Sequence, residues 1–261
     1  MGVSTARPEP GIAVVTVDFP PVNALPVRGW YELAEAVRAA GADPDVRCAV
    51  LRATGRGFNA GVDIKELQRT PGHRALLGAN HGCATAFSAV YDCPVPVVAA
   101  VHGFCLGGGV GLAGNADAVV AGEDATFGLP ELDRGALGAA THLARLVPQH
   151  LLRALSYTAR TVTAAELHRH GSVWRVVPPG EETAAALELA REIAAKDGSL
   201  LRLAKAALNG IDPVDVHRSY RYEQGFTFEA TLSGVGDRHR DAFADRNGRE
   251  DRHGRGRKDA P

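Results

Sequence analysis

Two glycine-rich loops carry residues whose type and spacing suit anion chemistry. In Val95–Gly114, an apolar strand leads through HGFCL into three consecutive glycines and then into an apolar helix start. In Gly55–Gln68, which follows the apolar strand CAVLR, the small pair Ala60-Gly61 precedes a helix. Backbone N–H groups that no side chain covers can hold an oxygen that is negative or becomes so during a reaction. The two loops together predict an oxyanion or anion site, although tight helix-to-strand packing explains the triple glycine alone equally well.

A dinucleotide-binding site is a competing interpretation of the same glycines. Gly109-x-Gly111-x-x-Gly114 matches the fingerprint literally, and Asp133 follows about 20 residues later. The loop HGFCL, however, separates the strand from the glycines, and a new strand begins soon after Gly114. The intervening helix would be too short for a dinucleotide site, so the match is interpreted as accidental.

Ionisable residues that follow the triple glycine in the sequence are candidates for acid–base chemistry. Glu131 in GLPE either acts as a general base or caps a turn after Pro130. Asp133 is either a second acid or base or the ion-pair partner of Arg134. His142 ends a run of small residues and is either a catalyst or a helix residue with satisfied hydrogen bonds.

The elements that must position these residues alternate between strand and helix. Ile12–Asp18 is apolar on both parities, which predicts a strand covered on both faces. The stripe Trp30-Leu33-Ala34-Val37 predicts a helix that ends before Gly41, and helical spacing dominates again past Gly180. Further short strands are predicted at Cys48–Arg52, Val95–Val101, Ala118–Ala121 and Trp174–Val177. This order predicts an α/β domain with parallel strands and a helical extension.

Composition excludes several classes of protein. The 261 residues are 45% apolar, enough for a sizeable core, and 29 basic against 30 acidic residues give a net charge of -1. We therefore expect no nucleic-acid and no membrane partner. The four cysteines show no CxxC spacing or paired histidines, so neither a disulfide framework nor a metal site is predicted. Without a secretory signal or an apolar run of roughly 20 residues, the protein is expected to be cytoplasmic.

Several motifs together resemble the crotonase, or enoyl-CoA hydratase/isomerase, superfamily over Gly11–Phe243. They are VNAL at 22–25, FNAGVDIKEL at 58–67, HGFCLGGGVGL at 102–112 and ATFGLPE at 125–131. The resemblance implies an α/β spiral of repeated ββα units with a C-terminal helical trimerisation region. It divides the chain into a core at 1–195 and helices at 196–245. The last segment, 246–261, has no apolar periodicity, which predicts a disordered tail or, alternatively, a basic contact for a phosphorylated ligand. The resemblance also implies an acyl-CoA thioester substrate, no cofactor beyond that coenzyme A, and a homotrimer or homohexamer.

The resemblance also assigns roles to individual residues. The backbone N–H groups of Ala60 and Gly108 are expected to form an oxyanion hole for the thioester carbonyl, with Glu131 as general base. The residues expected to lie near coenzyme A are Asn23, Ala24, Asp63, Ile64 and Lys65, although a solvated helix position explains Lys65 equally well.

This sequence departs from the hydratase pattern at one position. By the resemblance, hydratases of the family place two glutamates around one water. In this sequence the first of these positions is Gly111, and the second is Glu131. One carboxylate suffices to move a proton along an allylic system or to activate water toward a carbonyl. Two segments, DATFGLPELDRGALGAATHLARLVPQHL and YRYEQGFTFEATL, resemble a branch of the family that hydrolyses a ring carbon–carbon bond of a bicyclic ketone CoA thioester in steroid breakdown. That hydrolase is the leading hypothesis; an enoyl-CoA isomerase or hydratase, and a noncatalytic acyl-CoA-binding protein, are the alternatives.

Overall fold

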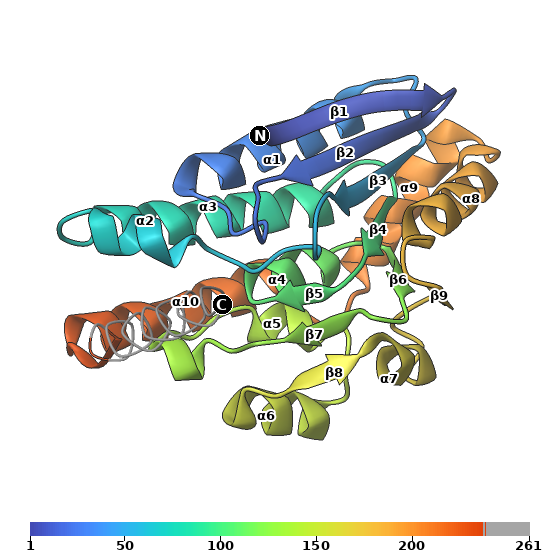
Figure 1. Ribbon diagram of the computed structural model, residues 1–261. Helices are drawn as coiled ribbons and strands as arrows, with labels where there is room; N and C mark the ends of the chain where they lie inside the picture. Colours follow the sequence, from blue (N-terminus) through green and yellow to red (C-terminus); the bar gives the residue numbers. More distant parts are fainter. Residues whose placement is uncertain (237, 239–261) are drawn as a thin grey trace, which may run out of the picture.

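The larger of two β-sheets forms the centre of the molecule. The computed structural model describes residues 1–236 and 238, and this sheet has the strand order β1-β2-β3-β4-β6-β9 (Figure 1). Every neighbouring pair is parallel except β1 and β2, which are antiparallel. Its strands are β1 (Gly2–Glu9), β2 (Ile12–Asp18), β3 (Cys48–Ala53), β4 (Val97–Val101), β6 (Ala118–Gly122) and β9 (Arg175–Val177). The parallel strands were predicted to within two residues; the edge strand β1 was not.

A smaller sheet holds the loops that the sequence singled out. It consists of β5 (Phe104–Leu106), β7 (Thr126–Gly128) and β8 (Thr161–Thr163), with β5 and β7 parallel. The chain passes from β4 to β5 and then into α4 (Gly108–Ala113), and again from β6 to β7 before α5 (Ala140–Leu143). This repeated ββα order confirms the predicted fold. Because α4 has only six residues, it is too short for a dinucleotide site.

Helices cover both faces of the large sheet. On one face, α1 (Val27–Ala42) packs against α3 (Arg74–Tyr91), and Trp30 is completely buried. On the other face, α8 (Glu182–Ala194) covers a second cluster of buried residues. The prediction that the first helix ends before Gly41 was wrong, because Gly41 is a close-contact position inside α1. A Cβ there would lie 2.7 Å from Pro94 Cδ and 2.8 Å from Cys93 Sγ.

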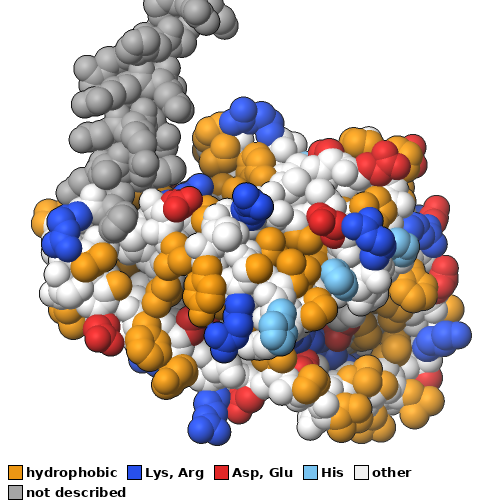
Figure 2. Space-filling view, turned by 90° about the horizontal axis from the view of Figure 1, so that it is seen from below, with side chains coloured by type: hydrophobic (Ala, Val, Ile, Leu, Met, Phe, Trp, Pro, Cys, Tyr) orange, Lys and Arg blue, Asp and Glu red, His pale blue; other side chains and the backbone are white. Residues whose placement is uncertain are grey.

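After β9 the described chain is helical, as predicted for the segment past Gly180. After α8 come α9 (Gly198–Gly210) and α10 (Val216–Leu232), which contacts α3 and α5 and lies below α2 (Ile64–Arg69) in Figure 1. The remaining elements are the 3₁₀ turn η1 (Leu132–Arg134), α6 (Gln149–Thr158) and α7 (Ala164–Arg169). Figure 2 shows the lower face of the molecule, where apolar side chains and charges of both signs alternate. The predicted tail at 246–261 lies outside the described residues.

Candidate active site

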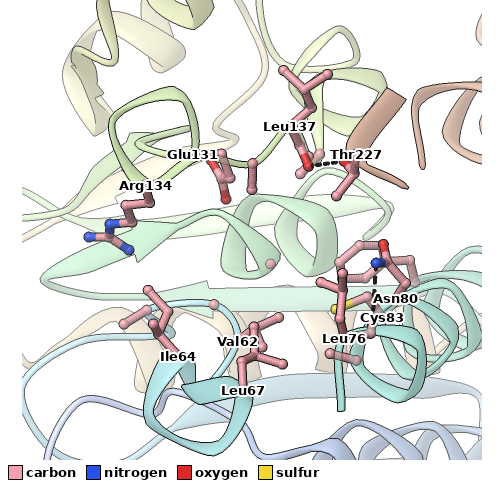
Figure 3. A pocket seen from close by; sticks show the side chains of 18 of the residues that line it. Val62, Ile64, Leu67, Leu76, Asn80, Cys83, Glu131, Arg134, Leu137 and Thr227 are labelled. Carbon is pink, nitrogen blue, oxygen red and sulfur yellow. Dashed lines mark hydrogen bonds between the residues drawn. The ribbon is translucent and has the colours of Figure 1, made fainter. Parts of the chain in front are cut away.

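A largely apolar cavity lies where α2, α3, the segment after β7 and α10 meet (Figure 3). Its empty volume is about 790 Å³, a value that includes the open mouth. Its wall combines aliphatic side chains with a few polar groups from four parts of the chain. The labelled lining residues are Val62, Ile64, Leu67, Leu76, Asn80, Cys83, Glu131, Arg134, Leu137 and Thr227.

The two glycine-rich loops meet at this cavity. Ala60, Gly61 and Gly108 all line it, and a Cβ built on Gly61 would lie 3.3 Å from the Gly108 nitrogen. Gly108 is the first residue of α4, so its N–H has no intrahelical acceptor. A side chain at Gly108 is excluded, because its Cβ would lie 2.5 Å from Trp30 Cη2. The neighbouring Gly61 amide is already engaged, donating to Asn59 Oδ1 over 2.8 Å.

Two buried asparagines hold the Gly55–Gln68 loop in place. Asn23 Oδ1 accepts from the Phe19 N–H at 2.8 Å, and Asn23 Nδ2 donates to the Thr54 and Gly57 carbonyls at 2.6 and 2.9 Å. Asn59 Nδ2 in turn donates to the Asn23 carbonyl at 2.7 Å. The Asn23 side chain was predicted to lie near coenzyme A, but it is buried with its polar atoms used inside the protein. The side chain of Asn23 holds the loop in place, and the expected position of this residue near coenzyme A stays a prediction.

Glu131 lies across from α4, on the turn that follows β7. Its backbone carbonyl accepts from Arg134 and Ala136, both at 2.9 Å, and its side chain points into the cavity. Oε1 lies against Gly107, where an added Cβ would overlap it, and the buried Oε2 has no hydrogen-bond partner among the described residues. Burial raises the pKa of Glu131 to about 8; its own backbone N–H and Arg134 lower it, and Glu223 raises it further. A buried carboxyl with a raised pKa is suited to general acid–base chemistry.

The other acid–base candidates have different surroundings. Arg134 lines the cavity, and burial lowers the pKa of its guanidinium against the opposing effect of Glu131 and Asp133. Asp133 is exposed and is not part of the cavity wall. His142 is buried behind the wall, with its Nδ1 3.0 Å from Asn115 Nδ2, and burial lowers its pKa to about 3. Asp133 and His142 therefore lie outside the cavity wall, and their expected acid–base roles stay predictions.

Gly111, the position at which the resemblance places a glutamate in hydratases, lies against an aromatic ring. A Cβ on Gly111 would overlap the ring of Phe87, which comes from α3 and lines the cavity. This ring packs between Trp30 and His142, with centroid distances of 5.7 and 4.8 Å. An aromatic side chain thus occupies the space beside Gly111, and no carboxylate faces Glu131 from there.

Comparison with known proteins identifies the family. Residues 7–233 match the family described as enoyl-CoA hydratase/isomerase. This chain belongs to the enoyl-CoA hydratase/isomerase family. Within the family, it is 63% identical to the (7aS)-7a-methyl-1,5-dioxo-2,3,5,6,7,7a-hexahydro-1H-indene-carboxyl-CoA hydrolase of Rhodococcus jostii (strain RHA1), covering 94% of this chain and 95% of the relative. It is 64% identical to the protein of the same name from Mycobacterium tuberculosis, covering 93% and 98%.

Solved structures of enoyl-CoA hydratase/isomerase proteins share the fold. An enoyl-CoA hydratase/isomerase from Xanthobacter autotrophicus Py2 aligns with a TM-score of 0.83 at 29% identity, covering 93% of this chain and 91% of the other. A carnitinyl-CoA hydratase from Mycobacterium avium aligns with a TM-score of 0.80 at 28% identity, covering 94% and 96%. The described residues contain no group of three or more histidines, cysteines or acids placed to hold a metal ion. Nor do they include a helix long and apolar enough to cross a membrane.

The residues expected near coenzyme A lie on or beside α2. Ile64 lines the cavity, and Asp63 caps α2 by accepting from the Lys65 N–H at 2.9 Å. Lys65 itself is exposed, and Ala24 is half-buried outside the cavity wall. Their contacts with coenzyme A stay a prediction.

Several wall residues were missed by the sequence analysis. Ala79, Cys83 and Phe87 recur every fourth residue along α3, and Tyr220 and Thr227 are seven residues apart on α10. Both spacings place residues on one face of a helix and could have identified a wall. Neither spacing says whether that face borders a cavity or a packed core.

Proposed function

We propose that this protein hydrolyses a ring carbon–carbon bond of a bicyclic ketone CoA thioester. One observation carries the proposal: a single buried carboxylate, Glu131, borders the cavity, while Phe87 fills the space beside Gly111. A site with one carboxylate suits the attack of one activated water on an electrophilic carbonyl. The identity of 63–64% to relatives named for a hydrolase of a dioxo-hexahydroindene-carboxyl-CoA supports the same reaction.

The chemistry follows from these groups. Ionised Glu131 takes a proton from water while the water oxygen bonds to the ring carbonyl carbon. The adduct collapses by breaking the adjacent ring bond, which leaves a carboxylic acid and sends the electron pair through an alkene into the thioester. The N–H groups of Ala60 and Gly108 donate to the thioester oxygen, which carries the developing charge. Glu131 then returns its proton to the carbon skeleton, so one water is consumed and the base is restored.

The rest of the cavity suits a ring system of this kind. Aliphatic side chains from α2 and α3, including Ile64, Leu67 and Leu76, offer apolar contact to fused rings. The proposed substrate brings its own coenzyme A, so no other cofactor takes part in the proposed steps. Asp63 and Lys65 at the start of α2 are proposed to lie near the nucleotide part of that coenzyme A.

Isotopic labelling tests the reaction directly. The protein is given a bicyclic ketone CoA thioester and, separately, a simple enoyl-CoA in heavy-oxygen water, and the products are analysed by mass spectrometry. Label in a new carboxylate with the thioester intact supports the hydrolase. Label in a 3-hydroxyacyl-CoA would instead identify a hydratase. Double-bond migration without label would identify an isomerase, and saturable binding without turnover an acyl-CoA-binding protein.

We also propose that the protein assembles as a homotrimer or homohexamer. Leu200 and Leu203 on α9, together with Ile211, the residue that caps its C-terminus, have exposed fractions of 65%, 67% and 77%. A stripe of large apolar side chains on one helix is typical of a protein–protein contact. Light scattering should give three or six chain masses, and Leu203→Glu should lower that mass; a monomeric wild-type protein would contradict the proposal.

A further inference from the structure

Glu131 borders two cavities, not one. The second cavity has an empty volume of about 760 Å³, including its open mouth, and lies between the segment after β7, α6 and α10. Its wall contains Ser156 and Leu152 from α6 and Glu223 from α10, with the exposed side chain of Tyr157 at the rim. It therefore approaches Glu131 from a side that α2 and α3 do not line.

A short backbone segment separates the two cavities. Residues 136–138, Ala-Leu-Gly, line both of them. Two contacts from α10 hold this segment: Thr227 Oγ1 donates to the Leu137 carbonyl at 2.7 Å, and Glu223 accepts from the Ala140 N–H at 2.9 Å. The partition is thus fixed on one side by α10, and Glu131 is the ionisable side chain that lines both cavities.

Two buried polar atoms in the wall of the second cavity have no protein partner. They are Glu131 Oε2 and Ser156 Oγ, which form no hydrogen bond within the described part of the chain. Buried polar atoms are generally paired with protein groups or ordered water, and a polar, roomy cavity can hold such water. The wall therefore carries two polar atoms with unused hydrogen-bonding capacity, and one of them belongs to Glu131.

We propose that the second cavity is the route by which water reaches Glu131. This inference rests on the proposed hydrolysis, which consumes one water in each turnover. When the fused rings of a substrate fill the first cavity, water cannot replenish Glu131 through its mouth. The second cavity stays open to solvent from the other side of the 136–138 partition and delivers the next water to the same carboxylate.

Closing the second cavity tests the route. Ser156→Phe fills it from α6, and Ser156→Ala is the matched control that removes the hydroxyl but leaves the space open. Hydrolysis of the bicyclic ketone CoA thioester is followed across pH for both variants and for wild type. We expect Ser156→Phe to lower kcat by about tenfold or more with KM nearly unchanged, and Ser156→Ala to have a much smaller effect. Less water around Glu131 should also move the rising limb of the pH profile of Ser156→Phe to higher pH, which a purely structural defect would not do.

Leu152→Trp closes the same cavity from a second position and replaces Ser156→Phe if that variant does not fold. A wild-type kcat and pH profile in a folded, closed variant would overturn the water route. A large increase in KM with unchanged kcat would also overturn it, because it would mean that part of the substrate occupies the second cavity. If the wild-type protein fails to open the ring at all, the proposed hydrolysis fails instead, so the two failures are distinguishable.

Discussion

The two walls of the first cavity differ in whether they present a group that can transfer protons. On the α3 and α4 side, Gly111 and Phe87 form a closed aromatic wall in which an added methyl group would not fit. On the other side, Glu131 is buried with one carboxylate oxygen unpaired among the described residues. A two-glutamate site divides proton removal and proton delivery between two walls. Here one wall is closed packing, and in the proposed hydrolysis a single carboxylate carries both transfers.

The difference teaches that one pair of residues, Gly111 and Phe87, can turn a wall of this cavity into closed packing. A glycine at 111 alone would leave space beside α4, but the Phe87 ring from another helix fills that space. The remaining carboxylate is then surrounded by less polar material, and burial raises its pKa to about 8. Loss of one acid thus goes together with a stronger base at the other position.

Removing the single carboxylate should have the largest effect. Glu131→Gln is expected to lower kcat by about 10²- to 10⁴-fold, the usual contribution of a general acid–base group, while acyl-CoA binding is nearly retained. Turnover and calorimetric binding measure the two effects. Asp133→Asn, two residues away on an exposed position, is the matched control and should stay near wild type. Full activity of a folded Glu131→Gln variant would remove Glu131 from the mechanism.

The same substitution should stabilise the protein at high pH. The pKa of Glu131 in the folded protein is about 8 against an ordinary 4.5, so its contribution favours folding below pH 4.5 and is lost as pH rises toward 8. Between pH 5 and 9, the unfolding free energy of Glu131→Gln relative to wild type should therefore rise by on the order of 3 kcal/mol. Denaturant unfolding at several pH values measures this gain. If the difference in unfolding free energy between Glu131→Gln and wild type did not vary with pH, ionisation of Glu131 would not destabilise the folded protein.

The pH dependence of catalysis comes next in size. A general base must be ionised, so kcat/KM should rise about tenfold per pH unit below 8 and level off above it. Initial rates from pH 6 to 9 test this, with circular dichroism confirming that the fold is intact throughout. A profile that already levels off at pH 6 would contradict the effect of burial on this carboxyl.

A substitution in the wall formed by Gly111 and Phe87 should change the unfolding free energy of the protein. Gly111→Ala forces a methyl group into the Phe87 ring and should lower the unfolding free energy by about 1–3 kcal/mol, as overpacked cores do. Gly225→Ala is the control, because Gly225 lies exposed within α10 with open space around its Cα and should gain about 0.5–1 kcal/mol. Thermal or denaturant unfolding compares them. Equal effects would show that Phe87 moves aside easily.

The strands and the two glycine loops could be predicted because their signals are local. A run such as Ile12–Asp18 is apolar at successive positions, and consecutive glycines before an apolar run mark the start of a helix with uncovered N–H groups. Glu131 was found through a motif next to those loops. The edge strand β1 was not predicted, because most of its side chains are exposed and its partner β2 determines its pairing.

The unpredicted parts of the site depend on contacts between distant segments. Nothing in the sequence near Gly111 indicates that Phe87 will fill the space beside it. Asn23 resembled a ligand-loop residue, but the carbonyls of Thr54 and Gly57 use its amide. Asp133 and Arg134 are neighbours in sequence, yet only Arg134 lines the cavity, because the turn at η1 points the two side chains to different environments.

The position of α10 has a consequence for the order of events during protein synthesis. The cavity wall begins with Ala60 and is completed by Tyr220 and Thr227. Chains emerge from the ribosome N-terminus first, so the sheet and the glycine loops are available long before α10. A nascent chain that has reached α9 therefore has an open half-site, and the same helix that closes the wall also fastens the turn after Glu131 through Glu223 and Thr227. The cavity wall is thus complete only after α10 has docked.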